Sequence, residues 1–573
     1  MAVHNKEIAE ILEEMADLLD IKGDNPFRIR SYRNAARTVF GLPDSLDKMV
    51  DKHGKIQELP GIGKSIAQKI REIVETGELS QLKRLKNEIP ESLLEIMKLE
   101  QMGPQRTKLL HEELGIVSIA DLKKEAQEGK IEKVKGFGKK TSEKILKEIE
   151  EYAKAGRVER FRLGEADELT DALMDHLGKK LEDLTIAGSY RRRKETVGDI
   201  DILATSENPS EGMEHFVSFE ETSDILSMGT TRSSVKLRSG LQVDLRIVKK
   251  QSYGAALLYF TGSKAHSIAL RKLGQEKGFK VNEYGVFMGR KRLASRTERS
   301  VYRELGLHYI QPEMREDRGE ILAARDNALP DLVTLDDIRG DLQTHTNATD
   351  GRNSLTEMAK AAEKMGYAYY AVTDHSKRVS MAGGLNEGRL AKQIEEIDAL
   401  NEKMKKLKIL KSIEVDILED GSLDLSDDIL KELDLVVCAI HYNKNLPGQA
   451  NTKRILRAMD NPYFNILAHP TGRLIGERRG YDLDMERIMK GAQERGCYLE
   501  INANPERLDL NDQHIRMAKE LGLKLSISTD AHSIDNLEYM KYGVSQARRG
   551  WLEKDDVINT RSLADLKSLL KRS

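Results

Sequence analysis

Residues 368–376 read AYYAVTDHS, residues 435–443 read LVVCAIHYN and residues 464–472 read FNILAHPTG. Each is an apolar, strand-like run that ends close to a histidine. Runs of this kind alternate with helical segments seven times after residue 338. The alternation predicts a parallel (β/α) barrel, in which the chemistry lies at the carboxyl ends of the strands.

Side chains that bind metals gather just past these strand ends: His345, Asp350, Asp374, His375, Glu414, His441, His469, Asp530 and His532. His, Asp and Glu are ligands for hard or borderline divalent cations. A single histidine at a strand end is usually a packed residue, but five of them beside carboxylates predict a multinuclear metal hydrolase. Glu414 is the best candidate to bridge two ions, because each of its oxygens can serve one.

Length and composition bound the remaining possibilities. A chain of 573 residues exceeds a single core, which predicts roughly three to four domains. Lys and Arg number 93 against 95 Asp and Glu, so any nucleic-acid contact must come from local patches. Cys438 and Cys497 lie in apolar runs and are expected to be buried thiols in a reducing compartment. No apolar run approaches the roughly 18 residues of a membrane span, so we expect a cytoplasmic monomer without membrane contact.

Residues 1 to about 155 show helical spacing of apolar residues, which predicts an all-α region with three similar breaks. The breaks are LPGIGKSIAQKI at 59–70, LEQMGPQRTKLL at 99–110 and VKGFGKKTSEKI at 134–145. Each places a glycine-containing turn before a helix, and the turn glycines are Gly61, Gly63, Gly103, Gly136 and Gly138. Free amides there and the helix dipole of about half a positive charge suit phosphate rather than bases, which predicts sequence-independent binding. The alternative is an ordinary helical hairpin with glycine caps.

From about residue 184, the spacing of apolar residues changes from the helical pattern to the alternation of β-strands. In VGDIDIL, Asp199 and Asp201 are two residues apart, so they share one face while Ile200 and Ile202 point to the core. Asp244 in LQVDLRIV points away from its apolar neighbours by the same rule. Three ionised carboxylates on one sheet face require cations, and two divalent ions roughly 4 Å apart would clamp an in-line phosphoryl displacement. A D-x-D pair alone also fits a solvated strand edge.

The motifs GSYRRRKETVGDID at 188–201, VDLR at 243–246, YFTGS at 259–263 and NEYGVF at 282–287 resemble those of the family X DNA polymerases, the DNA polymerase beta family. The resemblance runs over residues 1 to about 318 and implies an α/β nucleotidyltransferase palm and thumb that bind deoxynucleoside triphosphates with Mg²⁺ or Mn²⁺. It implies that Asp199 and Asp201 hold both metals and that Asp244 activates the primer 3′-hydroxyl. The implied nucleotide contacts are Arg160, Ser189, Arg192, Gly198, Tyr259, Phe260, Gly262 and Arg271. Lys264 and Ser267 depart from the family at base-contact positions.

The N-terminal breaks resemble helix-hairpin-helix elements, which implies a monovalent cation held by hairpin carbonyls. Lys69 matches the deoxyribose-phosphate lyase nucleophile of the family, with Tyr32 and Arg28 as its neighbours. An amine there can form a Schiff base if its pKa is lowered. Ser65 and Gln81 replace family lysines that bind the 5′ phosphate, and a solvated helix lysine is the alternative.

The C-terminal region resembles the PHP (polymerase and histidinol phosphatase) domain, a distorted (β/α)7 barrel that holds two to three divalent metals such as Mn²⁺ or Zn²⁺. Gln343 replaces the first histidine of the usual H-x-H motif, and an amide is a poorer ligand than imidazole. The other eight family positions are filled by His345, Asp350, His375, Glu414, His441, His469, Asp530 and His532. Arg473 and Asn504 are candidates for the substrate cleft.

These resemblances divide the chain into a lyase-like helical domain at 1–85, a hairpin-bearing fingers domain at 86–158, the palm at 159–248, the thumb at 249–318, a linker at 319–337 and the PHP domain at 338–573. They imply a repair polymerase that fills short gaps in gapped or nicked duplex DNA, with a 3′–5′ exonuclease that also acts at abasic sites or on 3′-phosphoesters. One alternative is a nucleotidyltransferase for RNA or a small molecule with a PHP phosphatase. Another is a DNA-binding scaffold with inactive sites.

Overall fold

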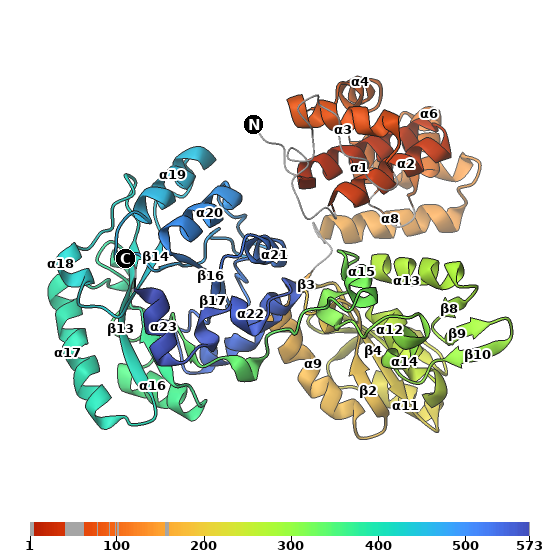
Figure 1. Cartoon of the computed structure of the whole chain (residues 1–573). Coiled ribbons are helices and arrows are strands. Elements are labelled where there is room, and N and C mark those ends of the chain that lie inside the picture. Colours follow the sequence, from red (N-terminus) through yellow and green to blue (C-terminus); the bar gives the residue numbers. More distant parts are fainter. Residues whose placement is uncertain are drawn as a thin grey trace. The chain divides into compact units, whose positions relative to one another are not determined.

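The computed structural model describes residues 5–40, 62–76, 78–90, 92–97, 99, 102–154 and 160–571. Two compact units make up the chain, Met1–Glu159 and Arg160–Ser573. Figure 1 shows that the first consists of helices and that the second contains the sheets. None of the helices within the described ranges is long and apolar enough to cross a membrane.

The N-terminal unit is all helix where it is described, as its apolar spacing predicts. Its helices are α1 (Asn5–Lys22), α2 (Pro26–Phe40), α3 (Lys64–Thr76), α4 (Ser80–Glu88), α5 (Leu93–Ile96), α6 (Pro104–Leu114), α7 (Ile119–Gln127) and α8 (Lys139–Lys154). Leu12, Met15 and Leu110 belong to the buried core that its described residues form. The helices α3, α6 and α8 begin at the three sequence breaks.

The palm is a five-stranded sheet with the order β2-β4-β7-β6-β5. Its elements are β1 (Phe161–Arg162), α9 (Leu163–Leu177), β2 (Glu182–Ile186), α10 (Gly188–Arg191), β3 (Thr196–Val197), β4 (Asp199–Thr205), α11 (Pro209–Val217), β5 (Thr222–Met228), β6 (Arg232–Leu237) and β7 (Gln242–Ile247). β4 and β7 are parallel neighbours at the centre. Ile200 and Ile202 are buried in the core, so the predicted period-2 pattern of this strand is confirmed.

The thumb follows, with helices around a small antiparallel sheet of order β10-β9-β8. Its elements are α12 (Tyr253–Thr261), α13 (Lys264–Glu276), β8 (Lys280–Asn282), β9 (Gly285–Met288), β10 (Lys291–Ala294) and α14 (Glu298–Glu304). The segment 319–337, expected to be a linker, contains α15 (Glu320–Arg325). Ala324 and Leu332 from this segment pack into the thumb core, together with the partly buried Ile321, Ala323 and Leu329.

Seven parallel strands form the C-terminal barrel in chain order, β11-β12-β13-β14-β15-β16-β17. They are β11 (Gly340–Asp341), β12 (Tyr369–Val372), β13 (Lys408–Asp416), β14 (Leu435–Ala439), β15 (Ile466–Leu467), β16 (Tyr498–Asn502) and β17 (Leu525–Ser528). The helices are α16 (Leu355–Lys364), α17 (Glu387–Lys403), α18 (Asp427–Leu430), α19 (Gly448–Ala458), α20 (Met485–Arg495), α21 (Asp512–Glu520), α22 (Met540–Arg549) and α23 (Leu563–Leu570). The barrel is nearly closed, since the His345 amide donates to Ala531 O at 2.8 Å and the Asp530 amide to Gln343 O at 3.0 Å. The predicted (β/α)7 barrel is confirmed.

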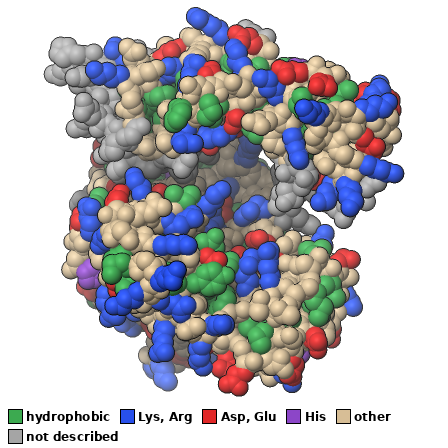
Figure 2. Space-filling model, turned by 90° about the vertical axis from the view of Figure 1, so that its right-hand side faces the viewer, with side chains coloured by type: hydrophobic (Ala, Val, Ile, Leu, Met, Phe, Trp, Pro, Cys, Tyr) green, Lys and Arg blue, Asp and Glu red, His purple; other side chains and the backbone are tan. Residues whose placement is uncertain are grey.

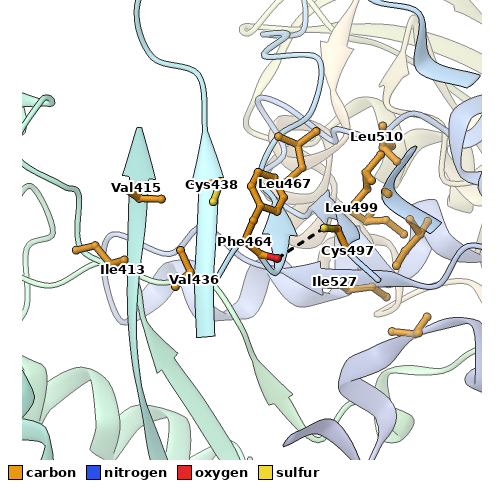
Figure 3. Close-up of a cluster of buried hydrophobic side chains, with 14 of the residues drawn as sticks. Ile413, Val415, Val436, Cys438, Phe464, Leu467, Cys497, Leu499, Leu510 and Ile527 are labelled. Atoms are coloured by element: carbon orange, nitrogen blue, oxygen red, sulfur yellow. Dashed lines mark hydrogen bonds between the residues drawn. The ribbon is translucent and has the colours of Figure 1, made fainter. Parts of the chain in front are cut away.

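The barrel core contains both cysteines as buried thiols. Figure 3 shows Cys438 on β14 and Cys497 beside Phe464, among Val415, Leu467 and other apolar side chains. The Cys497 thiol donates to Phe464 O at 3.6 Å. This packing fixes the strands whose carboxyl ends carry the histidines.

Candidate active sites

The three palm carboxylates lie on adjacent strands. Asp201 of β4 is paired in register with Asp244 of β7, and Asp199 is two residues earlier on the same face of β4. Asp244 is buried and accepts hydrogen bonds from Ser234 Oγ and, at 3.3 Å, from Gln242 Nε2. The structure therefore brings the three predicted residues together.

Burial and mutual repulsion act on these carboxylates in the metal-free chain. Burial, followed by the charges of Asp199 and Asp244, raises the pKa of Asp201 from 3.8 to about 6. Burial and the Asp244 charge also raise the pKa of Asp199. Divalent cations would relieve this repulsion, so the donor set fits the metals that the sequence predicts.

Arg160 and Gly198 flank the cluster. Arg160 donates to Thr196 from two nitrogens, at 2.8 and 2.9 Å, and its charge lowers the pKa of Asp199 against the effect of burial. A Cβ at Gly198 would lie 3.3 Å from Arg160 Nη1. The absence of a side chain at this glycine leaves room for the guanidinium beside the carboxylates.

The turn between β2 and β3 carries Ser189 and Arg192. A Cβ at Gly188 would lie 2.9 Å from Asp201 Oδ2, so α10 begins in contact with the carboxylates. Arg192 is buried, and its Nη1 donates to Thr261 O while a Cβ on Gly262 would lie 3.1 Å away. These contacts bring the predicted phosphate contacts next to the Gly262 turn.

The aromatic pair at the end of α12 packs against the guanidinium of Arg246. The rings of Tyr259 and Phe260 meet edge to face with centroids 5.1 Å apart, and the guanidinium of Arg246 lies 4.4 Å from the Phe260 centroid. Arg271 lies on α13 and donates to Ser267 O at 3.2 Å. Tyr259 and Arg271 are exposed, as contact with a substrate requires.

The hairpin glycines lie at helix starts where they are described; Gly61 lies outside the described residues. Gly63 O accepts from Ile66 and Ala67, and Gly138 O accepts from Thr141 and Ser142. Gly103 precedes Pro104 at the start of α6, and Gly136 has a φ of +96° that favours glycine. The first turns of α3, α6 and α8 contain no acidic residue, so each described helix start suits an anion.

Lys69 lies on α3 and is near both residues expected beside it. Its Nζ donates to Ser65 Oγ at 3.0 Å and lies 5.8 Å from the ring centroid of Tyr32. Burial, and after it the charge of Arg28, lowers the pKa of Lys69. Tyr32 donates to Gln81 Oε1 at 3.3 Å.

Glu414 is the centre of the barrel site. Its Oε2 lies 3.3 Å from both His345 Nε2 and His375 Nδ1, and its Oε1 lies 3.0 Å from His469 Nε2 and 3.4 Å from His441 Nε2. Burial favours the protonated form of Glu414, but the imidazoles of His375, His345 and His441 outweigh it and hold the pKa of the carboxyl well below its ordinary range. The two oxygens thus face different pairs of histidines.

Two aspartates complete the ring. Asp530 Oδ1 lies 3.2 Å from His345 Nε2. Asp350 lies 3.4 Å from His375 Nε2 through Oδ2 and 3.5 Å from His532 Nε2 through Oδ1. Together with Glu414, these residues make three overlapping groups with metal-ligand spacing. Seven of the eight predicted ligands line one cavity of about 330 Å³. The eighth, His345, is buried behind it, 3.3 Å from Glu414 and 3.2 Å from Asp530.

Several nitrogen and oxygen atoms of the barrel site converge without forming hydrogen bonds to one another, as metal ligands do. Among the described residues, the Gln343 amide and both ring nitrogens of His345 are buried without a hydrogen-bond partner. The His345 nitrogens approach carboxylates closely but outside hydrogen-bond geometry, as expected when lone pairs converge on a common point. The ligand set fits divalent metals, and the chain would hold them through these imidazoles and carboxylates.

A surrounding layer of polar residues was not found from the sequence. Asp416 accepts from the His441 amide at 2.9 Å and lies 3.2 Å from its Nδ1. Glu500 accepts from the His469 amide at 2.7 Å, and Asn502 donates to Asp530 at 3.0 Å. Two pairs of these polar residues are two positions apart on one strand face: Glu414 and Asp416 on β13, and Glu500 and Asn502 on β16. This i, i+2 spacing is the signal in the sequence that could have found Asp416, Glu500 and Asn502.

Three further residues considered from the sequence lie outside the metal cluster. Asp374 is buried and accepts from Thr346, Thr349 and Gln393, so its carboxylate organises the loop after β11. Arg473 is occupied by Glu195 at 2.7 Å. Asn504 caps the turn at Glu506, accepting from its amide at 3.0 Å.

Family models match the chain in the order of its motifs. They are a helix-hairpin-helix domain over 3–79, a SAM-like helix-hairpin-helix tandem over 93–151, the DNA polymerase beta palm over 157–254, the DNA polymerase beta thumb over 256–316 and the PHP domain over 341–504.

Curated proteins are similar over the whole chain and over parts of it. The chain is 39% identical over 579 residues to DNA polymerase/3′-5′ exonuclease PolX of Bacillus subtilis (strain 168), with 100% of both chains covered. A probable phosphatase of Thermoanaerobacter sp. (strain X514) is 30% identical over 242 residues, which are 40% of this chain and 94% of that one. DNA polymerase lambda of Rattus norvegicus is 26% identical over 349 residues, covering 55% of this chain and 56% of that protein. The full-length similarity and the palm, thumb and PHP matches show that the chain belongs to the family X DNA polymerases with a C-terminal PHP domain.

Proposed function

We propose that the palm catalyses template-directed addition of deoxynucleotides at a primer 3′ end in short gaps of duplex DNA. Asp199 and Asp201 would hold two Mg²⁺ or Mn²⁺ ions, and Asp244 would accept the proton of the primer hydroxyl. Ser189, Arg192, Gly198 and Arg160 would contact the triphosphate, with Tyr259, Phe260, Gly262 and Arg271 at the sugar and base. The contact of Gly188 with Asp201, the charge of Arg160 beside Asp199 and the contact of Arg192 with the Gly262 turn support these assignments.

The barrel is proposed to be a metal-dependent 3′–5′ exonuclease that also removes abasic or phosphorylated 3′ ends. Two to three Mn²⁺ or Zn²⁺ ions would be held by the eight ligands around Glu414, which would bridge two of them. Bound metals polarise a phosphoester and supply a nucleophile at neutral pH. The phosphatase and exonuclease names of the relatives agree with one phosphoester chemistry on different substrates.

The hairpins are proposed to bind the phosphate backbone, with hairpin carbonyls holding a monovalent cation. Their described helix starts lack acidic first turns, and the face of the molecule in Figure 2 carries many Lys and Arg side chains. A small-molecule nucleotidyltransferase has no use for such elements. Duplex DNA is therefore the favoured substrate over RNA or a small molecule.

The observation that carries this proposal is the presence in one chain of two independent ligand clusters, around Asp201 and Glu414. A gapped duplex with a 5′-labelled primer tests it, with each metal in turn and with or without dNTPs. Asp201→Asn should abolish extension and leave degradation of the primer 3′ end, while Glu414→Gln should do the reverse. Equal loss of both activities in either variant contradicts the two-site proposal.

A lyase activity at Lys69 is a second proposal, supported by the lowered pKa of its amine and by its position beside Tyr32. The amine would form a Schiff base with the open sugar of an incised abasic site. Borohydride trapping of a covalent adduct with such DNA tests it directly.

A further inference from the structure

The palm and thumb share an extensive interface with the barrel. Leu163, Ile475, Leu508 and Tyr542 form one buried apolar cluster across it. A Cβ at Gly164 of α9 would lie 2.9 Å from the side chain of Pro505, so the two surfaces meet closely. Figure 1 shows α22 at this junction, on the side of the barrel next to the palm.

Arg549, the last residue of α22, reaches the nucleotide-binding turn of the palm. Its side chain is only 3% exposed. Nη1 donates to the backbone oxygen of Arg192 at 2.7 Å and to Glu316 Oε1 at 3.1 Å. Nη2 donates to Asp512 Oδ2 at 2.6 Å, which anchors the guanidinium to the start of α21. One barrel side chain thus holds both the backbone of Arg192 and the carboxylate partner of Arg192.

Glu316 is shared by two guanidinium groups. Arg192 Nε donates to the same Oε1 atom at 3.2 Å. Burial favours the protonated form of Glu316, but the charges of Arg549 and then Arg192 outweigh it and lower the pKa of the carboxyl. Arg549 therefore contributes more than Arg192 to keeping Glu316 ionised.

The sharing matters for phosphate binding by Arg192. A carboxylate paired with Arg192 alone competes with a triphosphate for the same guanidinium. Arg549 takes up part of the Glu316 charge and, through Arg192 O, fixes the turn that begins at Gly188 beside Asp201. Without Arg549, Glu316 would attract Arg192 more strongly and the turn would lose a buried donor.

We propose that Arg549 of the PHP barrel, anchored by Asp512, is a positioning residue for nucleotide binding at the polymerase site. The inference rests on the proposed polymerase function and on the proposed phosphate contact of Arg192. It makes the barrel a structural part of the polymerase site, in addition to any chemistry at its own metals.

The same turn is held at two further points. Gln546 Nε2 donates to Arg193 O at 3.3 Å, and Arg193 Nε donates to Ser545 Oγ at 3.3 Å. Arg473 donates to Glu195 Oε2 at 2.7 Å. These contacts come from α22 and from the loop after β15, so the barrel supports the turn from two elements.

The test measures KM for the incoming dNTP and kcat on gapped DNA for wild type, Arg549→Met and Arg548→Met. Arg548 is the matched control, because it is on the same helix and contacts Glu313 at 2.7 Å and Val333 O at 3.1 Å instead of the turn. Breaking one partner of a buried ion pair is strongly unfavourable, so Arg549→Met should raise the KM for dNTP about tenfold or more, with kcat within about threefold. Arg548→Met should leave KM within about twofold.

A merely structural defect would lower kcat through the folded fraction and leave KM unchanged. An unchanged KM in Arg549→Met, or an equal rise in Arg548→Met, overturns the proposal. If Arg549→Met does not fold, as judged by loss of 3′–5′ degradation in the same preparation, Arg549→Lys replaces it. A lysine ammonium cannot donate to the three acceptors of Arg549 in one plane, so the KM for dNTP of Arg549→Lys should rise about threefold. A KM equal to that of wild type contradicts the inference. Failure of wild type to incorporate any dNTP would instead refute the proposed function.

Discussion

Replacing Asp201 with Asn should stabilise the metal-free protein while abolishing polymerisation. The pKa of Asp201 is raised from 3.8 to about 6, first by burial and then by the charges of Asp199 and Asp244. A carboxyl whose folded pKa exceeds its unfolded pKa contributes stability below the unfolded value and loses it as the pH rises through the folded value. For Asp201 this window runs from 3.8 to about 6. A rise of that size corresponds to about 3 kcal/mol of free energy of unfolding lost at pH 8.

The assay is urea or thermal unfolding in EDTA at pH 5 and pH 8, followed by a signal from the palm. Asp201→Asn should raise the free energy of unfolding by up to about 3 kcal/mol at pH 8 and by roughly half as much at pH 5. Asp171→Asn is the matched control, since Asp171 is an exposed carboxylate of α9 outside the cluster. It should change stability by less than about 0.5 kcal/mol at either pH.

Divalent metal should reverse the comparison. Divalent cations that bind the folded wild type stabilise it by mass action. The variant lacks the negative charge of the Asp201 carboxylate, so divalent cations should raise its free energy of unfolding less. Two results would refute the argument that burial and the charges of Asp199 and Asp244 destabilise the ionised Asp201. One is a variant less stable than wild type in EDTA at pH 8, and the other is an equal increase in the free energy of unfolding at pH 5 and pH 8.

The other predictions concern the barrel, Lys69 and the hairpins. Gln343 supplies an amide in place of imidazole, so metal analysis should show substoichiometric occupancy of one position, and Gln343→His should restore it; three chelator-resistant metals in wild type would contradict this. Lys69→Ala should abolish borohydride trapping, which we expect to be weak in wild type because Ser65 and Gln81 are not cationic; trapping that survives the substitution assigns the chemistry elsewhere. Duplex binding should be insensitive to sequence and fall steeply with salt. The double substitution Lys139→Glu and Lys140→Glu, at exposed positions in the first turn of α8, should reduce affinity about tenfold or more; unchanged affinity would make that hairpin structural only.

The sequence predicted those features that depend on local periodicity. The placement of Asp199 and Asp201 on one face follows from the two-residue period of a strand, and the barrel follows from the alternation of strands and helices. Strand alternation predicted that Asp244 shares a face with Asp199 and Asp201, but the register that pairs Asp244 with Asp201 joins strands about forty residues apart and comes from the structure. The gathering of ligands at the strand ends was expected from the barrel, whereas the pairing of each Glu414 oxygen with two particular histidines comes only from the structure.

The residues that the sequence missed act through distant partners. Asp416 and Glu500 orient His441 and His469. Their i, i+2 spacing from Glu414 and Asn502 is visible in the sequence, but the histidines that they contact come from other strand ends. Arg549 ends an ordinary amphipathic helix, and no local pattern connects it with Glu316. The segment expected to be a linker contains apolar residues such as Leu332 that pack into the thumb core, and composition alone does not reveal this core.

The shared turn of the palm has a consequence for assigning activities to domains. Arg473, four residues after His469, binds Glu195, which is three residues after Arg192. A truncation that removes residues 338–573 therefore removes both Arg473 and Arg549 along with the metal ligands. Loss of polymerisation in such a truncation would not locate polymerase chemistry in the barrel, because the support of the turn is lost at the same time. Substitutions at Asp201 and Glu414 change the ligands and leave the interface intact, so only they separate the two chemistries.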